Sequence, residues 1–174
     1  MTGRGGDAAV ARRWLGARLG RSIAPTLSPS SDPLPAARRF GWWSLLAWLT
    51  LGLVLEAMHG FKVGWYLDVG HETRRLMLTL AHVHGTLLAL INLAFAATMR
   101  PTDSSRRQLG WAGACLRWSG VMMPAGFLGG GLQTFGDDPG FAIALVPIGG
   151  LLLLTGVLLA ARALEHGTPP PEAP

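Results

Sequence analysis

Four side chains in this sequence are of types that bind metals or carry protons: Glu56, His59, His82 and His84. A neutral imidazole nitrogen suits haem iron, copper and proton transfer, and a nearby carboxylate can fix the tautomer of a histidine ligand. Glu56 and His59 are three residues apart, so on a helix they share one face. His82 and His84 are two residues apart, roughly 200° around a helix, so at most one of them faces a given site.

The neighbours of the two later histidines indicate which one points inward. His82 shares its helical stripe with Thr79 and Thr86, a small and polar face that suits close helix packing. His84 shares its face with Leu88 and other apolar residues. We therefore expect His82 to be the interior residue and His84 to reach a neighbouring helix, a lipid headgroup or a second ligand.

Three functions fit these four residues. In the leading hypothesis, His59 together with His82 or His84 ligates haem b or copper, with Glu56 supporting a ligand, in an electron-transfer or assembly component. In the second, the same residues form a proton relay or a pocket for a small solute or quinol. In the third, they hydrogen-bond helices together in a non-catalytic accessory subunit. None of the three requires the isolated chain to be an enzyme.

The elements that must position these residues are four long apolar segments, at 40–59, 76–99, 109–132 and 141–163. Each is close to the ~20 residues that an α-helix needs to cross about 30 Å of hydrocarbon. Such segments can cross lipid only as helices, because every backbone polar group must be paired. The sequence therefore predicts an all-α, multi-pass membrane protein with an antiparallel four-helix bundle. Its Gly, Ala and Thr faces favour a homo-oligomer or a larger membrane complex.

Charge along the chain predicts how these helices are oriented. The net charge is +5, seven of the 15 basic residues precede the first segment, and none lies between the third and fourth. This distribution predicts that both termini are cytoplasmic. The four candidate residues then fall in the outer half of the bilayer. We interpret the positive charge as a topology signal and not as a nucleic-acid surface.

Cysteine and arginine usage adds two constraints. Cys115 is the only cysteine, which excludes an intramolecular disulfide and a Cys-based zinc site. Fourteen of the 15 basic residues are arginine, a bias that suggests a GC-rich genome and fits a bacterial inner membrane.

Two polar tails flank the apolar segments. Residues 1–39 are rich in Arg, Gly, Ser and Pro, which predicts a disordered basic cytoplasmic tail. Within it, residues 8–21 either form an amphipathic helix on the inner leaflet or stay disordered. Residues 164–174 form a short polar C-terminal tail. The glycine-rich stretch 126–140 predicts either a mobile outer lid or a close helix contact followed by a turn.

Residues Ala81 to Gly85 (AHVHG) resemble a His-x-His-Gly motif of small bacterial four-helix membrane proteins that have no assigned function. The pattern is also loosely similar to the histidine-bearing helices of haem-copper oxidase subunit one and its small relatives. This resemblance favours ligation of haem or copper by the histidines. The larger subunit has further helices and histidines that this chain lacks, so the resemblance does not imply oxygen reduction. It is confined to residues 56–92.

Overall fold

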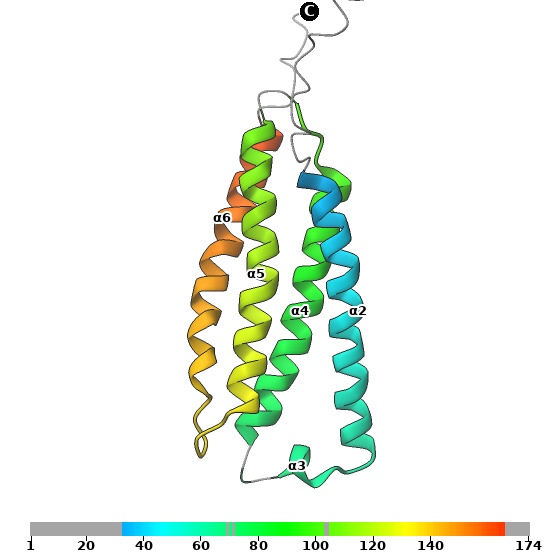
Figure 1. Ribbon diagram of the computed structural model, residues 1–174, viewed down its shortest axis with the longest axis vertical. Coiled ribbons are helices and arrows are strands. Elements are labelled where there is room, and N and C mark those ends of the chain that lie inside the picture. Colours follow the sequence, from blue (N-terminus) through cyan, green and yellow to red (C-terminus); the bar gives the residue numbers. More distant parts are fainter. Residues whose placement is uncertain (1–32, 69, 71, 103–104, 166–174) are drawn as a thin grey trace, which may run out of the picture. The chain divides into compact units, whose positions relative to one another are not determined.

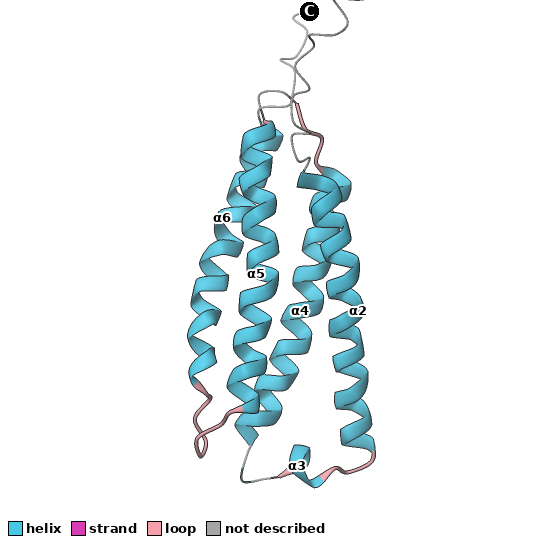
Figure 2. Cartoon of the chain, viewed as in Figure 1, coloured by secondary structure: helices cyan, strands magenta, loops and turns pink. Residues whose placement is uncertain are grey.

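Four long helices make up most of the chain that the computed structural model describes, which is residues 33–165 without 69, 71, 103 and 104. A one-turn helix lies between the first two of them, and a 3-10 turn leads into the last. In chain order the elements are α2 (Pro33–Gly60), α3 (Gly64–Leu67), α4 (Glu72–Thr98), α5 (Arg106–Leu132), η2 (Phe141–Ala144) and α6 (Leu145–Glu165). The described part of the chain is all-helical, as the sequence predicts, and contains no strand (Figure 2).

Helices α2, α4 and α5 begin before the apolar segments that predict them, whereas α6 begins at Leu145, after its predicted start at residue 141. Helix α2 begins at Pro33 and not at Phe40, so residues 33–39, which the sequence assigns to the disordered tail, are helical. A proline suits the first turn because its missing N–H has no helical partner there, and Ala37 is fully buried against the other helices. Residues 1–32, including the predicted interfacial helix at 8–21, and residues 166–174 lie outside the described residues.

Consecutive long helices run antiparallel and pack side by side in the order α2, α4, α5, α6 (Figure 1). Helix α5 also contacts α2, whereas α6 packs mainly on α5 and on η2. More residues are buried on α5 than on any other described helix. Helix α5 is therefore the central element, and α2 and α6 each leave a broad outer face uncovered.

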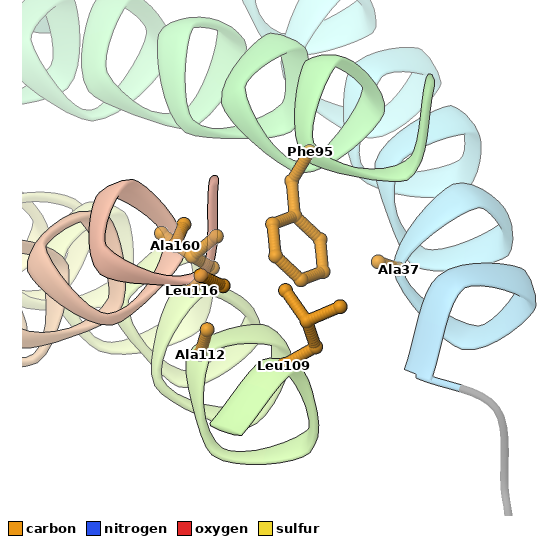
Figure 3. Close-up of a cluster of buried hydrophobic side chains, with 7 residues drawn as sticks. Ala37, Phe95, Leu109, Ala112, Leu116 and Ala160 are labelled. Atoms are coloured by element: carbon orange, nitrogen blue, oxygen red, sulfur yellow. The ribbon is translucent and has the colours of Figure 1, made fainter. Parts of the chain in front are cut away.

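One cluster of buried side chains draws on all four long helices. The ring of Phe95 on α4 points toward Leu109 of α5, and Ala37 of α2 closes the space beside it (Figure 3). Leu116 of α5 and Ala160 of α6 extend the same cluster. Burial of these residues ties α2 to the α5–α6 pair, although few other contacts join them.

The glycine-rich end of α5 stays helical because neighbouring elements pack directly against it. A Cβ on Gly126 would crowd Val146, and one on Gly131 would crowd Met77 of α4. Beyond the helix, two backbone hydrogen bonds of 3.0 and 3.1 Å join Phe135 and Asp138 in a tight turn. These contacts favour the prediction of close packing and a turn for this stretch.

Large apolar side chains cover the outer faces of the helices. Trp43 and Leu53 on α2 are 68% and 71% exposed, and Leu151 and Leu154 on α6 are 67% and 69% exposed. Three helical segments, α2, α4 and Phe141–Glu165, are long and apolar enough to cross a membrane by length and composition. Helix α5 is as long, but its glycines and its three arginines lower its hydropathy, and its neighbours cover much of its surface.

Candidate ligand-binding site

Helices α2 and α4 interlock through two glycines and two large rings. His82 on α4 lies over Gly52 of α2, where any Cβ would overlap the imidazole ring. In the opposite direction, Trp48 of α2 lies over Gly85 of α4, where a Cβ would overlap the indole. Each ring therefore occupies the space that a glycine on the facing helix leaves open.

This close approach lets His82 bond to the backbone of α2. Its Nδ1 lies 2.7 Å from the carbonyl oxygen of Trp48. A carbonyl oxygen can only accept, so Nδ1 carries the proton and donates it. In the neutral imidazole, Nε2 is then left with a free lone pair. Among the described residues no partner for Nε2 is present.

His84 lies on a different face of α4, as the two-residue spacing predicts. Its Nδ1 lies 2.9 Å from the carbonyl oxygen of Leu80 in the same helix. Its ring packs against Phe127 of α5, with 4.8 Å between ring centroids. His84 therefore does not line a common cavity with His82, and it contributes to the contact between α4 and α5.

The other three candidates do line one cavity. It lies between α2, α3 and α4, has a volume of about 350 Å³ and is open on one side. We call it the histidine cavity and define it by the described residues that line it: Gly52, Leu55, Glu56, His59, Tyr66, Thr79 and His82. Glu56 and His59 are exposed, as expected for the last turn and a half of α2. The structure thus brings Glu56, His59 and His82 to one site.

A second open cavity of about 490 Å³ adjoins the first. We call it the arginine cavity, and it is lined by Tyr66, Glu72, Thr73, Arg75, Leu76 and Thr79. Tyr66 and Thr79 line both cavities and so form the wall between them. The Tyr66 side chain is only 6% exposed, and its hydroxyl makes no hydrogen bond to any described residue.

Sequence reasoning does not single out Tyr66, although it is the only tyrosine in the chain. Its place depends on the path of the connection after α2, where Lys62 adopts a positive φ of 54° and turns the chain toward α4. A lone tyrosine beside a tryptophan, close to the end of an apolar segment, is the one signal that points to it. That signal is also typical of an ordinary interfacial aromatic residue.

The first turn of α4 fixes both connections at this end of the helices. Arg74 donates from Nη1 to the carbonyl oxygen of Trp65 at 3.1 Å, and its guanidinium lies 4.8 Å from the centre of the indole. From Nη2 it reaches the hydroxyl of Thr134 at 3.4 Å. Thr73 donates to the carbonyl oxygen of Asp137 at 2.7 Å. These bonds hold α3 and the turn after α5 in place beside the two cavities.

The described residues contain no group of three or more His, Cys, Asp or Glu side chains that could hold a metal ion. Glu56, His59 and His82 line the same cavity without converging on one point. The donor set therefore fits a ligand that bonds to one or two of these side chains at a time.

Comparisons with models of protein families, with curated proteins and with solved structures find no match to this chain. The resemblance of Ala81 to Gly85 to a His-x-His-Gly motif therefore stays a prediction. The fold and the cavities define the class that the structure supports: an all-helical protein with three helices that are long and apolar enough to span a membrane.

Proposed function

We propose that all four long helices of this chain cross a bacterial inner membrane, with both termini cytoplasmic, and that the chain binds a small ligand in the histidine cavity. Three of the helices have the length and composition for this. The large apolar side chains on the outer faces of α2 and α6 would contact lipid. Helix α5 is less apolar, but it lies between α4 and α6, so lipid contacts only part of its surface.

One observation carries the ligand-binding proposal: Nδ1 of His82 bonds to Trp48, while Nε2 has no partner among the residues that the structure describes. The bond to Trp48 fixes both the orientation and the tautomer of the ring. A ring that served only to join α2 and α4 would need no cavity beside it. Here the same ring lines a cavity of about 350 Å³ together with Glu56 and His59.

A haem or copper ligand is the second candidate. Histidines that bind metals usually donate their other ring nitrogen to a carbonyl or a carboxylate, and His82 donates Nδ1 in this way. If such a group binds, Nε2 of His82 and the imidazole of His59 would hold it, and Glu56 would orient a ligand. The group would supply electron transfer when bound. Oxidised and dithionite-reduced absorption spectra with elemental analysis test this candidate.

A purely structural role for the histidines is also supported by a specific observation, because both His82 and His84 bond to backbone carbonyls. The two roles are separated by native mass spectrometry of the detergent-purified protein. Ligand binding predicts a bound small molecule in the wild type and in His84→Ala, which is lost in His82→Ala. A structural role alone predicts no bound molecule whose presence depends on His82.

The membrane topology is tested separately by labelling single cysteines. Cys115→Ala provides a cysteine-free background, since the chain has no other cysteine. Phe61 and Arg107 are exposed at opposite ends of the helices and suit substitution by cysteine. We expect a membrane-impermeant maleimide to label Phe61→Cys in intact cells and Arg107→Cys only after the membrane is opened. Equal labelling of both in intact cells would contradict the proposed topology.

A further inference from the structure

We propose that the histidine cavity binds a primary ammonium group, and that the headgroup of an ethanolamine phospholipid presents it. This inference rests on the ligand-binding function proposed above and names the chemistry of the ligand.

The histidine cavity offers hydrogen-bond acceptors and negative charge. The Glu56 carboxylate has no hydrogen bond or ion pair with any described residue, and Nε2 of His82 has a free lone pair when the ring is neutral. None of the described residues that line this cavity is a lysine or an arginine. A ligand that satisfies these groups must donate hydrogen bonds and carry positive charge. A primary ammonium does both, because it has three N–H donors.

Tyr66 adds a polar group to the walls of both cavities. Most of its side chain is buried, but its hydroxyl has no partner among the described residues and is not one of their buried unpaired atoms. The hydroxyl is therefore accessible from the cavities that Tyr66 lines, where a bound ligand can meet it. The hydroxyl can accept from an ammonium in one cavity or donate to an anion in the other.

The arginine cavity identifies the group attached to the ammonium. Arg75 lines it, on the far side of the wall formed by Tyr66 and Thr79, and forms no ion pair with a described residue. A guanidinium binds phosphate oxygens well. Glu72 lines the same cavity and offsets the charge of Arg75, so a free anion gains little electrostatic stabilisation there. A phosphate that a two-carbon chain joins to the ammonium avoids this loss, because the positive ammonium offsets the negative charge of the phosphate.

The position of the two cavities favours a lipid as the source. Glu56 lies four residues before the end of α2, about 6 Å along the helix axis, and Arg75 lies in the first turn of α4. In the proposed topology this level is the outer headgroup region, which Trp65 and Tyr66 also mark as aromatic residues of the membrane interface. Acyl chains would then lie along the exposed apolar faces below.

The test compares lipids by native mass spectrometry of the full-length protein in detergent. Phosphatidylethanolamine, phosphatidylcholine with the same acyl chains, and soluble ethanolamine are titrated separately. We expect phosphatidylethanolamine to bind about tenfold more tightly than phosphatidylcholine, because a trimethylated nitrogen cannot donate to Glu56 or His82. Glu56→Gln should abolish this preference. Arg75→Gln should weaken binding of the phospholipid and leave soluble ethanolamine unaffected. Arg107→Gln, at the opposite end of the helices, is the matched control and should change neither.

Each other outcome has a distinct meaning. Equal affinity for the two phospholipids overturns the ammonium site. Binding of soluble ethanolamine as tight as that of the phospholipid, unchanged in Arg75→Gln, overturns the lipid as its source. A bound molecule of other chemistry that is lost in His82→Ala overturns this inference and leaves the proposed ligand-binding function standing. If no bound molecule depends on His82, this inference and the proposed ligand-binding function both fail.

Discussion

Replacing Gly52 with alanine tests how closely α2 and α4 approach each other. A Cβ on Gly52 would overlap the imidazole ring of His82, so the ring must turn away from α2. It then loses the 2.7 Å hydrogen bond to the carbonyl oxygen of Trp48. The substitution therefore acts on packing and on a hydrogen bond at the same point.

Three contributions set the size of the effect. Alanine stabilises a helix interior by about 1 kcal/mol relative to glycine. Overpacking a tight site costs about 1 to 3 kcal/mol, and an interhelical hydrogen bond in a membrane protein contributes about 0.6 kcal/mol. Together they predict that Gly52→Ala lowers the free energy of unfolding by about 0.5 to 2.5 kcal/mol.

The assay is equilibrium unfolding of the detergent-purified protein by sodium dodecyl sulfate, combined with a double-mutant cycle. In a His82→Ala background the new methyl group meets no ring, so Gly52→Ala should stabilise by about 1 kcal/mol through helix propensity alone. The two substitutions should therefore show a coupling of about 1.5 to 3.5 kcal/mol. Gly110→Ala is the matched control, because no heavy atom lies within 4 Å of a Cβ built there.

Two results would refute the reasoning. The first is a Gly52→Ala protein that matches Gly110→Ala in its change of stability while His82 is present, which would show that the ring does not lie on Gly52. Alternatively, the effects of Gly52→Ala and His82→Ala could simply add. In that case the two residues are not in contact, and the hydrogen bond from His82 to Trp48 loses its structural basis.

Three further predictions concern the other contacts of the fold. Asn92 is fully buried and donates to the carbonyl oxygen of Leu116 at 3.1 Å. Asn92→Ala should therefore lower the free energy of unfolding in detergent by about 1 kcal/mol. Unchanged stability would contradict this contact. Arg74→Gln removes the bond and the cation–π contact to Trp65, so the amides of residues 61–68 should exchange with deuterium several-fold faster, measured by mass spectrometry. A side chain on Gly149 of α6 would crowd Met123 of α5, so Gly149→Leu forces the two helices apart. It should lower Tm by about 5 °C, measured by Trp fluorescence. An unchanged Tm would show that the contact between α5 and α6 is looser.

The sequence predicts where the helices lie because apolar length is a local property. Each of the four apolar segments corresponds to a long helix or, at residues 141–144, to a 3-10 turn that leads into one. The predicted starts of α2, α4 and α5 are late for a physical reason. Apolar residues mark only the part of a helix that suits hydrocarbon, whereas Arg74 and Arg106 form good helix in the polar region beyond it. The end of α5 needs contacts from α4 and η2, and these contacts are not local in sequence.

The site is predictable only in part. Helical periodicity is enough to place Glu56 and His59 on one face and to separate His82 from His84. Which helix each residue meets depends on how side chains fit across an interface, as Tyr66 illustrates. Its position follows from the turn after α2, and no periodic pattern marks it.

The His-x-His-Gly segment of α4 packs against two neighbouring helices, so mutation of His82 alone cannot separate ligand binding from helix packing. Helix α4 packs on both α2 and α5, and the two-residue spacing lets His82 bond to one while His84 contacts the other. Gly85 admits a ring from α2 on the same side as His82. Loss of stability in a His82 variant is therefore expected with or without a ligand.

Glu56 is different, because it lines the cavity and contacts no described residue by hydrogen bond or ion pair. A Glu56→Gln protein that keeps its stability and loses its bound molecule would separate ligand binding from helix packing.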